Sequence, residues 1–247
     1  MHKYWKTRWG TCVHRSASGI EVHQNYFFRW LTFGNTDIQT LLHKKQPSKP
    51  GLCYILPFTI AARLAPGDTC MLGLGGAGVA HALQPFIKKS TLVAVENNPE
   101  IIELARTYFQ INTLKNLQVL HCDAGEYVQT CHQKYQHLMV DLFNSHAFPK
   151  HCNNLAFFKQ CRELLHPGGF FAINVADTAD HRSFLHLLQN EFKGCTVCFP
   201  IRKTTNLVIL AYHGESISPL LELLQQPSSG VKKITWTSDW GCVAELK

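Results

Sequence analysis

A glycine-rich turn and a later glutamate carry the strongest chemical signal in the sequence. Residues 73–78 read Gly-Leu-Gly-Gly-Ala-Gly and follow a short apolar run. Gly73 and Gly75 permit a tight turn and let a ligand approach the backbone closely, where a Cβ would block it. Glu96 ends the next apolar run, roughly 20 residues further on. A carboxylate at that point can accept hydrogen bonds from both hydroxyls of a ribose.

A third signal, Asp123-Ala124, ends the apolar run after that. A carboxylate and the adjacent backbone N–H can bind the polar edge of an adenine there. The carboxyl ends of parallel strands meet at one crevice, which is where open α/β sheets bind their ligands. Signals at three consecutive strand ends therefore predict a site for a nucleoside-type cofactor.

An alternation of strands and helices must position these residues. Apolar runs predict strands at 69–74, 91–96, 117–121, 137–141 and 170–175. Helical spacing predicts helices at 79–88, 99–109, 124–130, 155–165 and 183–192, and a closing pair of strands at 196–199 and 207–212. This alternation predicts an α/β fold with a doubly wound parallel sheet and helices on both faces.

The flanks of this region differ from it in pattern, so we expect three segments along the chain. Residues 1–50 alternate aromatic and polar residues between turn glycines, which predicts a small β-rich element, and QPSKP at 46–50 is the best linker candidate. Residues 51–213 form the cofactor-binding domain. Residues 214–247 predict a short helix at 219–225 and a tail that packs on that domain.

The composition excludes several broad classes of protein. The 247 residues include 24 Lys+Arg and 17 Asp+Glu, which gives a net charge of +7, and 45% are hydrophobic, as in an ordinary globular chain. The most apolar stretch, 52–65, is interrupted by Pro57 and Arg63 and is too short to span a membrane. The start of the chain has no apolar signal segment, so we expect a cytoplasmic protein whose ten cysteines are reduced. The charges are scattered, so we expect no nucleic-acid partner.

The identity of the cofactor depends on the segments downstream of the glycine turn. Gly73, Gly75 and Gly78 match the G-x-G-x-x-G spacing of NAD sites. Further along, however, Asp141 closes the fourth strand, and a helix, the sequence LLHPGG at 164–169 and a fifth strand come after it. That order is the usual layout of the Rossmann-like, methyltransferase-type fold that binds S-adenosylmethionine.

Five segments of the chain read GLGGAG, VAVENNP, HCDAGEYV, LMVDLFNS and LLHPGGFFAINV. They resemble the polyamine aminopropyltransferase (spermidine synthase) family, and look closest to its divergent bacterial spermidine synthase-like members. Upstream, IEVHQ, RWLTFG and Ile38-Gln39-Thr40 resemble the family's N-terminal β-hairpin domain, so the likeness covers residues 20–212. In that family, the aminopropyl group of decarboxylated S-adenosylmethionine moves to an amine and leaves methylthioadenosine. The resemblance also implies a homodimer.

The resemblance implies a role for each matching residue. The implied roles are ribose binding by Glu96, adenine binding by Asp123 and Ala124, and cofactor contact by Gln39. Tyr54 resembles the family's substrate-pocket tyrosine, and Asp141 would be the general base beside it. An alkyl ammonium has no lone pair and must lose a proton before it attacks carbon. A carboxylate at this position could accept that proton. The structural alternative for Asp141 is a cap at the strand end that binds nearby N–H groups.

The chain departs from the family's pattern on the acceptor side. Ala77 stands where the glycine loop normally carries an aspartate, and Asn144 where a second aspartate follows the base; Ile55 replaces a histidine or glutamine next to the tyrosine. An asparagine accepts a hydrogen bond but cannot neutralise an ammonium. A basic protein also does not steer a dication towards its site. We therefore expect an intact cofactor half and an atypical polyamine half, with a small-molecule amine as acceptor.

Two other functions remain open. A small-molecule methyltransferase would use intact S-adenosylmethionine and would have to accept the carboxylate of that cofactor. A nucleoside-binding protein without turnover would be compatible with the loss of both aspartates, at Ala77 and at Asn144.

Several weaker signals have both a functional and a structural interpretation. His146 and His151, in the loop after Asp141, could serve the acceptor or simply be solvated. Asp177 and Asp180 could replace a lost carboxylate or cap a helix. The lone C-x-x-C at 195–198 has no second pair with metal spacing, so we expect structural thiols and no metal.

Overall fold

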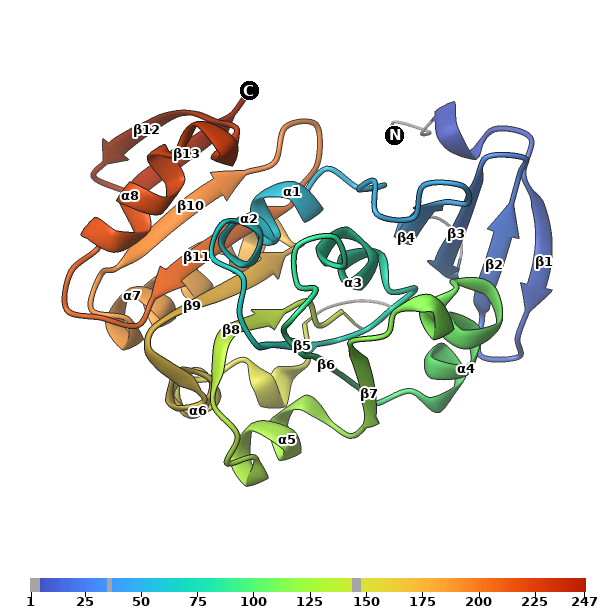
Figure 1. Cartoon of the computed structure of the whole chain (residues 1–247), viewed down its shortest axis with the longest axis horizontal. Helices are drawn as coiled ribbons and strands as arrows, with labels where there is room; N and C mark the ends of the chain where they lie inside the picture. Colours follow the sequence, from blue (N-terminus) through green and yellow to red (C-terminus); the bar gives the residue numbers. More distant parts are fainter. Residues whose placement is uncertain (1–4, 35–36, 144–147) are drawn as a thin grey trace.

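The computed structural model describes residues 5–34, 37–143 and 148–247, and its main feature is a nine-stranded sheet with the order β12-β13-β10-β11-β9-β8-β5-β6-β7 (Figure 1). The strands are β5 (Thr69–Leu72), β6 (Leu92–Glu96), β7 (Leu117–His121), β8 (Tyr135–Val140), β9 (Leu165–Val175), β10 (Thr196–Pro200), β11 (Leu207–Tyr212), β12 (Val231–Thr237) and β13 (Gly241–Leu246). The α/β prediction is confirmed.

The sheet is mixed, so the expectation of a parallel sheet is wrong for one half of it. Strands β7, β6, β5, β8 and β9 pair in parallel, but β11 pairs antiparallel with both β9 and β10. Strands β10 and β11 are antiparallel because a short loop connects them, and such a loop can join only antiparallel neighbours. The carboxyl end of β10 and the start of β11 therefore lie at the same sheet edge as the carboxyl ends of β5–β9.

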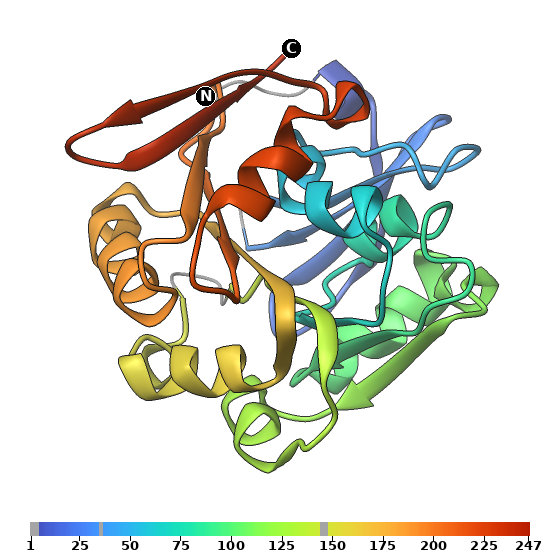
Figure 2. The same cartoon turned by 60° about the vertical axis from the view of Figure 1, so that its left-hand side comes forward.

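The C-terminal segment also differs from the expectation. The predicted helix is present as α8 (Ser218–Gln225), but the tail after it forms the antiparallel pair β12–β13, and β13 pairs in parallel with β10. The tail is thus part of the main sheet, as Figure 2 shows along the edge of β10. Without this pair, β10 would expose a row of unpaired backbone groups, which proteins generally cover.

Helices cover both faces of the sheet, as its alternating side chains require. Met71 and Met139 pack on one face with α1 (Ile55–Phe58), α2 (Ile60–Leu64), α3 (Gly78–Leu83) and α8. Cys70 and Leu138, one position earlier on the same strands, pack on the other face with α5 (Ala124–Thr130), α6 (Leu155–Glu163) and α7 (His181–Glu191). The short 3₁₀ helices are Trp5–Thr7, Ile111–Thr113, Lys150–Cys152, Thr178–Asp180 and Pro227–Ser229. In the described residues, no helix combines the length and hydropathy that a membrane crossing requires.

Two element boundaries differ from the sequence expectation for local reasons. Residues 166–169, expected to separate a helix from the strand at 170–175, belong to strand β9, which begins at Leu165. The reason is that β8 pairs with β9 on both sides of an irregularity in register, at Leu165 and again from Phe170. The positive φ of Gly168, 83°, lies within that irregularity. Helix α3 ends at Leu83, five residues earlier than the 79–88 expectation, and turns come after it.

The N-terminal β-rich element is a four-stranded antiparallel sheet, β1 (Thr11–Arg15), β2 (Ile20–Gln24), β3 (Phe28–Phe33) and β4 (Asp37–His43). Its Ile20, Val22 and Leu31 form a separate apolar cluster with Leu104 and Phe109, at α4 (Pro99–Tyr108). Figure 1 shows this sheet beside α4. The cluster therefore docks the small sheet on the carboxyl-end side of β6.

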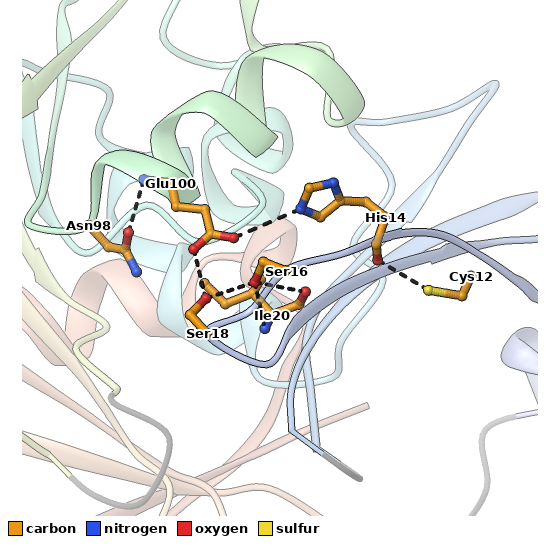
Figure 3. A network of polar contacts seen from close by, with 7 residues as sticks. All are labelled: Cys12, His14, Ser16, Ser18, Ile20, Asn98 and Glu100. Carbon is orange, nitrogen blue, oxygen red and sulfur yellow. Dashed lines mark hydrogen bonds and ion pairs between the residues drawn. The ribbon is translucent and has the colours of Figure 1, made fainter.

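A polar network locks the same two elements together (Figure 3). The carboxylate of Glu100, in the first turn of α4, accepts a 2.7 Å hydrogen bond from Ser18, and its Oε1 lies 3.8 Å from Nε2 of His14. The hydrogen bond from Ser18 is the main cause of a lowered pKa for Glu100. Asn98 caps the helix by accepting from the N–H of Glu100 at 2.9 Å. The turn between β1 and β2 is thus held against the loop that follows β6.

We expect His137 to make the fold sensitive to acid. Its buried ring donates from Nε2 to the carbonyl of Ala65 at 2.7 Å, and burial lowers its pKa to about 4. An unfolded histidine takes up its proton near pH 6.5, so stability should fall by about 3 kcal/mol as pH drops from 6.5 to 4. His137→Gln keeps a donor for Ala65. Urea unfolding at several pH values should show the gap between wild type and H137Q narrowing towards pH 4; a constant gap would contradict this assignment.

Candidate active site

A cavity of about 1730 Å³ opens at the carboxyl edge of the main sheet, between that edge and the N-terminal sheet. Its walls come from the loops that follow β5, β6, β7, β8 and β9, from β4, from the residues around α1, and from the β10–β11 loop. Ligand pockets commonly occupy about 300–1,000 Å³. The cavity is therefore large enough for a nucleoside-sized ligand and a second small molecule together.

The glycine turn forms the floor of this cavity, and its shape is imposed largely by protein packing. Gly73 has a φ of 96°, and a Cβ there would lie 2.3 Å from the carbonyl oxygen of Asp141. The N–H of Gly76 donates to Thr40 of β4 at 2.9 Å, which ties the turn to the N-terminal sheet. Gly73 and Gly75 line the cavity. Ala77, with a φ of 58°, is fully buried in the apolar core and is not among the lining residues.

Glu96 lies at the end of β6 and faces the glycine turn. Its Oε2 accepts from the backbone N–H groups of Leu74, at 3.0 Å, and Gly75, at 3.4 Å, and its Oε1 accepts from Asn98 at 3.0 Å. These bonds hold the carboxylate in one orientation at the cavity wall. A carboxylate oxygen has more than one lone pair, so the group can still accept from hydroxyls of a ligand.

Asp123 and Ala124 lie at the end of β7 and line the same cavity. Asp123 is also the N-cap of α5, because its Oδ1 accepts from the N–H of Gly125 at 2.8 Å and of Glu126 at 3.2 Å. Nε2 of His151 lies 3.1 Å from its Oδ2. His151 is thus beside the residue expected to bind adenine, and not on the acceptor side, where its place in the sequence suggests a role.

Tyr54 and Asp141 meet at the end of β8, although 87 positions separate them. The hydroxyl of Tyr54, the residue before α1, donates to Oδ2 of Asp141 at 2.7 Å. Burial raises the pKa of Asp141, and the hydrogen bonds from Asn174 and Tyr54 oppose that rise. Burial, reinforced by the charge of Asp141, holds the pKa of Tyr54 well above its usual range. Tyr54 therefore remains a hydrogen-bond donor to a carboxylate that is poised to take up a proton.

Sequence reasoning missed two residues that complete this arrangement. Asn174 of β9 donates from Nδ2 to Oδ1 of Asp141 at 2.9 Å, and Asn206 donates in turn to Oδ1 of Asn174 at 2.9 Å. Both line the cavity. A lone amide in the apolar strand FAINV could have pointed to Asn174. No comparable signal marks Asn206, which lies in the β10–β11 loop.

The other predicted residues lie in several parts of the molecule. Gln39 of β4 and Ile55 of α1 line the cavity, whereas Asn144 and His146 lie outside the described residues. Asp177 also lines the cavity and caps a 3₁₀ helix by accepting from the N–H of Ala179. Cys195, just before β10, and Cys198, on β10, are buried free thiols, and burial raises the pKa of Cys198 to about 12.

Comparison with known proteins identifies relatives of this chain. The family model for the spermine/spermidine synthase domain matches residues 71–220. A polyamine aminopropyltransferase of Chromobacterium violaceum is 25% identical over 198 residues, which cover 78% of this chain and 76% of the relative.

Two solved structures share the fold. A probable spermidine synthase from Corynebacterium glutamicum superposes with a TM-score of 0.70 at 16% identity, over 96% of this chain and 90% of that one. Human methyltransferase-like protein 13, in complex with SAH, superposes with a TM-score of 0.57 at 19% identity, over 80% of this chain and 95% of that one.

Proposed function

The chain belongs to the spermine/spermidine synthase family, and on this basis we propose that it is a spermidine synthase-like aminopropyltransferase that uses decarboxylated S-adenosylmethionine and an amine acceptor. One observation carries the proposal. The Tyr54–Asp141 pair lines the same cavity as Glu96 and Asp123, and the three carboxylates lie at the carboxyl ends of β8, β6 and β7. A proton acceptor and a nucleoside-binding wall are thus combined in one site.

In this proposal the β5–β7 side of the cavity binds the nucleoside. Glu96, already oriented by three backbone N–H groups, accepts from the ribose hydroxyls. Asp123 uses Oδ1 as a helix cap, and its Oδ2 lies 3.1 Å from Nε2 of His151; the adjacent N–H of Ala124 and the remaining lone pair of Oδ2 are therefore what the residue offers to an adenine edge. Gln39 reaches the cavity from the N-terminal sheet. The fit supports an adenosyl ligand, because hydroxyl donors and an amino group are what such acceptors bind.

Asp141 acts at the reacting nitrogen. The acceptor arrives as an ammonium and gives one proton to the carboxylate of Asp141, which frees the lone pair of the amine. The donor supplies a CH₂ group bonded to a positively charged sulfur; nitrogen forms a bond to this carbon while the carbon–sulfur bond breaks and its electrons remain on sulfur as a neutral thioether. A primary ammonium acceptor thus becomes a secondary ammonium, which takes over the positive charge from sulfur and keeps the two protons that remain on nitrogen. Tyr54 and Asn174 hold the two carboxylate oxygens of Asp141 in place throughout.

Parallel calorimetry with decarboxylated S-adenosylmethionine, S-adenosylmethionine and methylthioadenosine tests this proposal. We expect binding of decarboxylated S-adenosylmethionine and of methylthioadenosine, and aminopropyl transfer to an amine when the first is supplied. Tightest binding to intact S-adenosylmethionine would favour methyl transfer instead. Absence of binding to all three would overturn the assignment of the nucleoside site.

Replacing Glu96 by glutamine should weaken the binding of methylthioadenosine by about 10- to 100-fold, since hydrogen bonds to a charged group contribute about 1.5–3 kcal/mol each. Glu103→Gln is the matched control, because that carboxylate is exposed on α4, where it lies 3.9 Å from Arg106 and accepts a hydrogen bond from Thr107 at 3.2 Å. Calorimetry measures both affinities, and melting temperatures without ligand separate a binding defect from a folding defect. Equal losses in the two variants would contradict the role of Glu96.

Asn174→Ala should shift the acidic limb of the pH profile of kcat/KM to higher pH. The change removes a hydrogen bond to the ionised form of Asp141, so the pKa of that carboxyl should rise further. Asn206→Ala should act in the same direction but more weakly, because it frees the amide of Asn174 without removing it. A lower melting temperature with an unmoved pH profile would reduce both residues to a structural role.

A further inference from the structure

The ionisable side chains that line the cavity are ordered by sign along the sheet edge. Crossing from β7 through β6 and β8 to β9, the charged groups are all carboxylates: Asp123, Glu96, Asp141 and Asp177. Beyond β9, the loop between β10 and β11 contributes two cations, Arg202 and Lys203. The nucleoside-binding wall and the cationic loop therefore lie at opposite ends of the cavity, with Asp141 between them.

The cationic loop is coupled to Asp141 by hydrogen bonds. Asn206, at the base of the loop, donates to Asn174, and Asn174 donates to Asp141. The backbone N–H of Ile201 donates to the carbonyl of Asn206 at 3.0 Å, which closes the loop. Strands β9 and β11 follow β8 in the sheet, so the loop begins roughly 10 Å from Asp141 along the edge. A short aliphatic amine bound at Asp141 would extend towards it.

Among the described side chains, these two cations make one ion pair with a carboxylate, and it is an exposed one. Arg202 is largely exposed and reaches only Glu245, at 3.4 Å, a type of surface pair that contributes little. Among the side chains that the structure describes, which do not include that of Asp37, Lys203 has no carboxylate within 4 Å.

The carboxylates on this side offer little to a second ammonium. Asp141 already accepts from two neutral donors and serves the reacting nitrogen. Asp177 is exposed, and one of its oxygens is bound by the N–H of Ala179. The far end of a diamine would therefore meet two cations and a single capping carboxylate.

We propose that Arg202 and Lys203 recognise a carboxylate, and that the acceptor is an amine that also carries one, as a basic amino acid does. This inference rests on the proposed function, because it places the reacting amine at Asp141. A zwitterionic acceptor matches the order of charges: its side-chain ammonium faces Asp141 and its carboxylate faces the loop. Each charged end of such an acceptor meets a site group of opposite charge, whereas one ammonium of a diamine of the same length would meet the two cations. The site therefore favours the zwitterion.

Matched pairs of amines test the proposal on the whole chain. Ornithine and putrescine differ by one carboxylate, as do lysine and cadaverine. With methylthioadenosine saturating and at low ionic strength, where charge effects are least screened, calorimetry should show each amino acid binding about three- to tenfold more tightly than its diamine. Equal or tighter binding of the diamines would overturn the proposal, and so would failure of all four amines to bind beside the nucleoside.

Variants of the loop identify the groups responsible. The double change Arg202→Gln with Lys203→Asn should remove the preference for amino acids and leave methylthioadenosine affinity unchanged; asparagine is chosen because it tolerates the φ of 64° at position 203. Lys203→Asp should shift the preference towards putrescine. Lys115→Gln is the control, because this exposed lysine precedes β7 at the opposite sheet edge. A preference that survives the double change would contradict the proposal.

A parallel experiment distinguishes an acceptor carboxylate from a cofactor carboxylate. Intact S-adenosylmethionine is compared with its decarboxylated form in the wild-type chain and in the double variant. If the intact form bound more tightly in the wild type but not in the variant, Arg202 and Lys203 would bind the carboxylate of the donor, and the acceptor assignment would be wrong. If methylthioadenosine did not bind at all, the proposed function itself would fail. Binding of methylthioadenosine without any loop-dependent preference would reject this inference alone.

Discussion

Asp141→Asn is expected to lower the rate of group transfer by about two to four orders of magnitude, the usual contribution of a general base. The amide has nearly the same shape as the carboxylate and can still accept from Asn174 and donate to the hydroxyl of Tyr54. It cannot take a proton from an ammonium. The change therefore removes the proposed chemistry with little disturbance of the cavity.

The same variant should be at least as stable as the wild-type chain at neutral pH. Burial raises the pKa of Asp141 above its value in the unfolded chain, so the wild-type fold favours the neutral carboxyl. The stabilisation that the protonated Asp141 carboxyl gives to the fold is fully present below its pKa in the unfolded chain, about 4. This stabilisation is lost as pH rises through the pKa of the folded state. The asparagine does not titrate, so the stability of D141N relative to wild type should increase as pH rises through that window.

Chemical unfolding at a series of pH values, together with initial rates, measures both effects. Asp239→Asn serves as a control, since its carboxylate is exposed and lies 4.0 Å from Arg182, away from the cavity. We expect that control to keep its activity and its pH dependence. An active D141N, or one that loses stability relative to wild type as pH rises, would refute the assignment of a buried base.

Gly73→Ala is expected to destabilise the fold by about 2–5 kcal/mol and to abolish nucleoside binding. A side chain at a φ of 96° is strained, which costs about 1–2 kcal/mol. The added Cβ would also lie 2.3 Å from the carbonyl oxygen of Asp141, and forcing extra volume into a packed site costs about another 1–3 kcal/mol. Relief requires the ends of β5 and β8 to move apart, which separates the glycine turn from Asp141.

Gly194→Ala separates these two effects. Gly194 also has a positive φ, 74°, but a Cβ there would meet nothing within 4 Å. It should therefore lose only the strain energy, about 1–2 kcal/mol, and keep full affinity for methylthioadenosine. Urea unfolding and calorimetry on both variants make the comparison. Equal losses of stability would mean that strain alone, and not the contact with Asp141, requires glycine at position 73.

The amino-acid sequence by itself determined the parallel half of the sheet and the residues at its strand ends. Short apolar runs followed by glycine, glutamate or aspartate are local signals, because the length of a buried strand and the residue that ends it depend on neighbouring positions. Strand β7 and helix α5 have the same bounds as predicted, and Glu96 and Asp123 end up in one cavity. The strand–helix alternation then brought these ends to one edge of the sheet.

Only the tertiary structure decided which residues surround Asp141. Asn174 reaches it because Val140 pairs with Ile173, and Asn206 reaches Asn174 because β11 runs antiparallel to β9. Register and strand direction are set by contacts between segments far apart in the chain, which a single sequence does not display. The same holds for Gly73: its sequence signal suggested room for a ligand, whereas the position requires glycine because a carbonyl from another strand lies against it. The two cations of the β10–β11 loop likewise became part of the site only when the sheet placed that loop at the cavity edge.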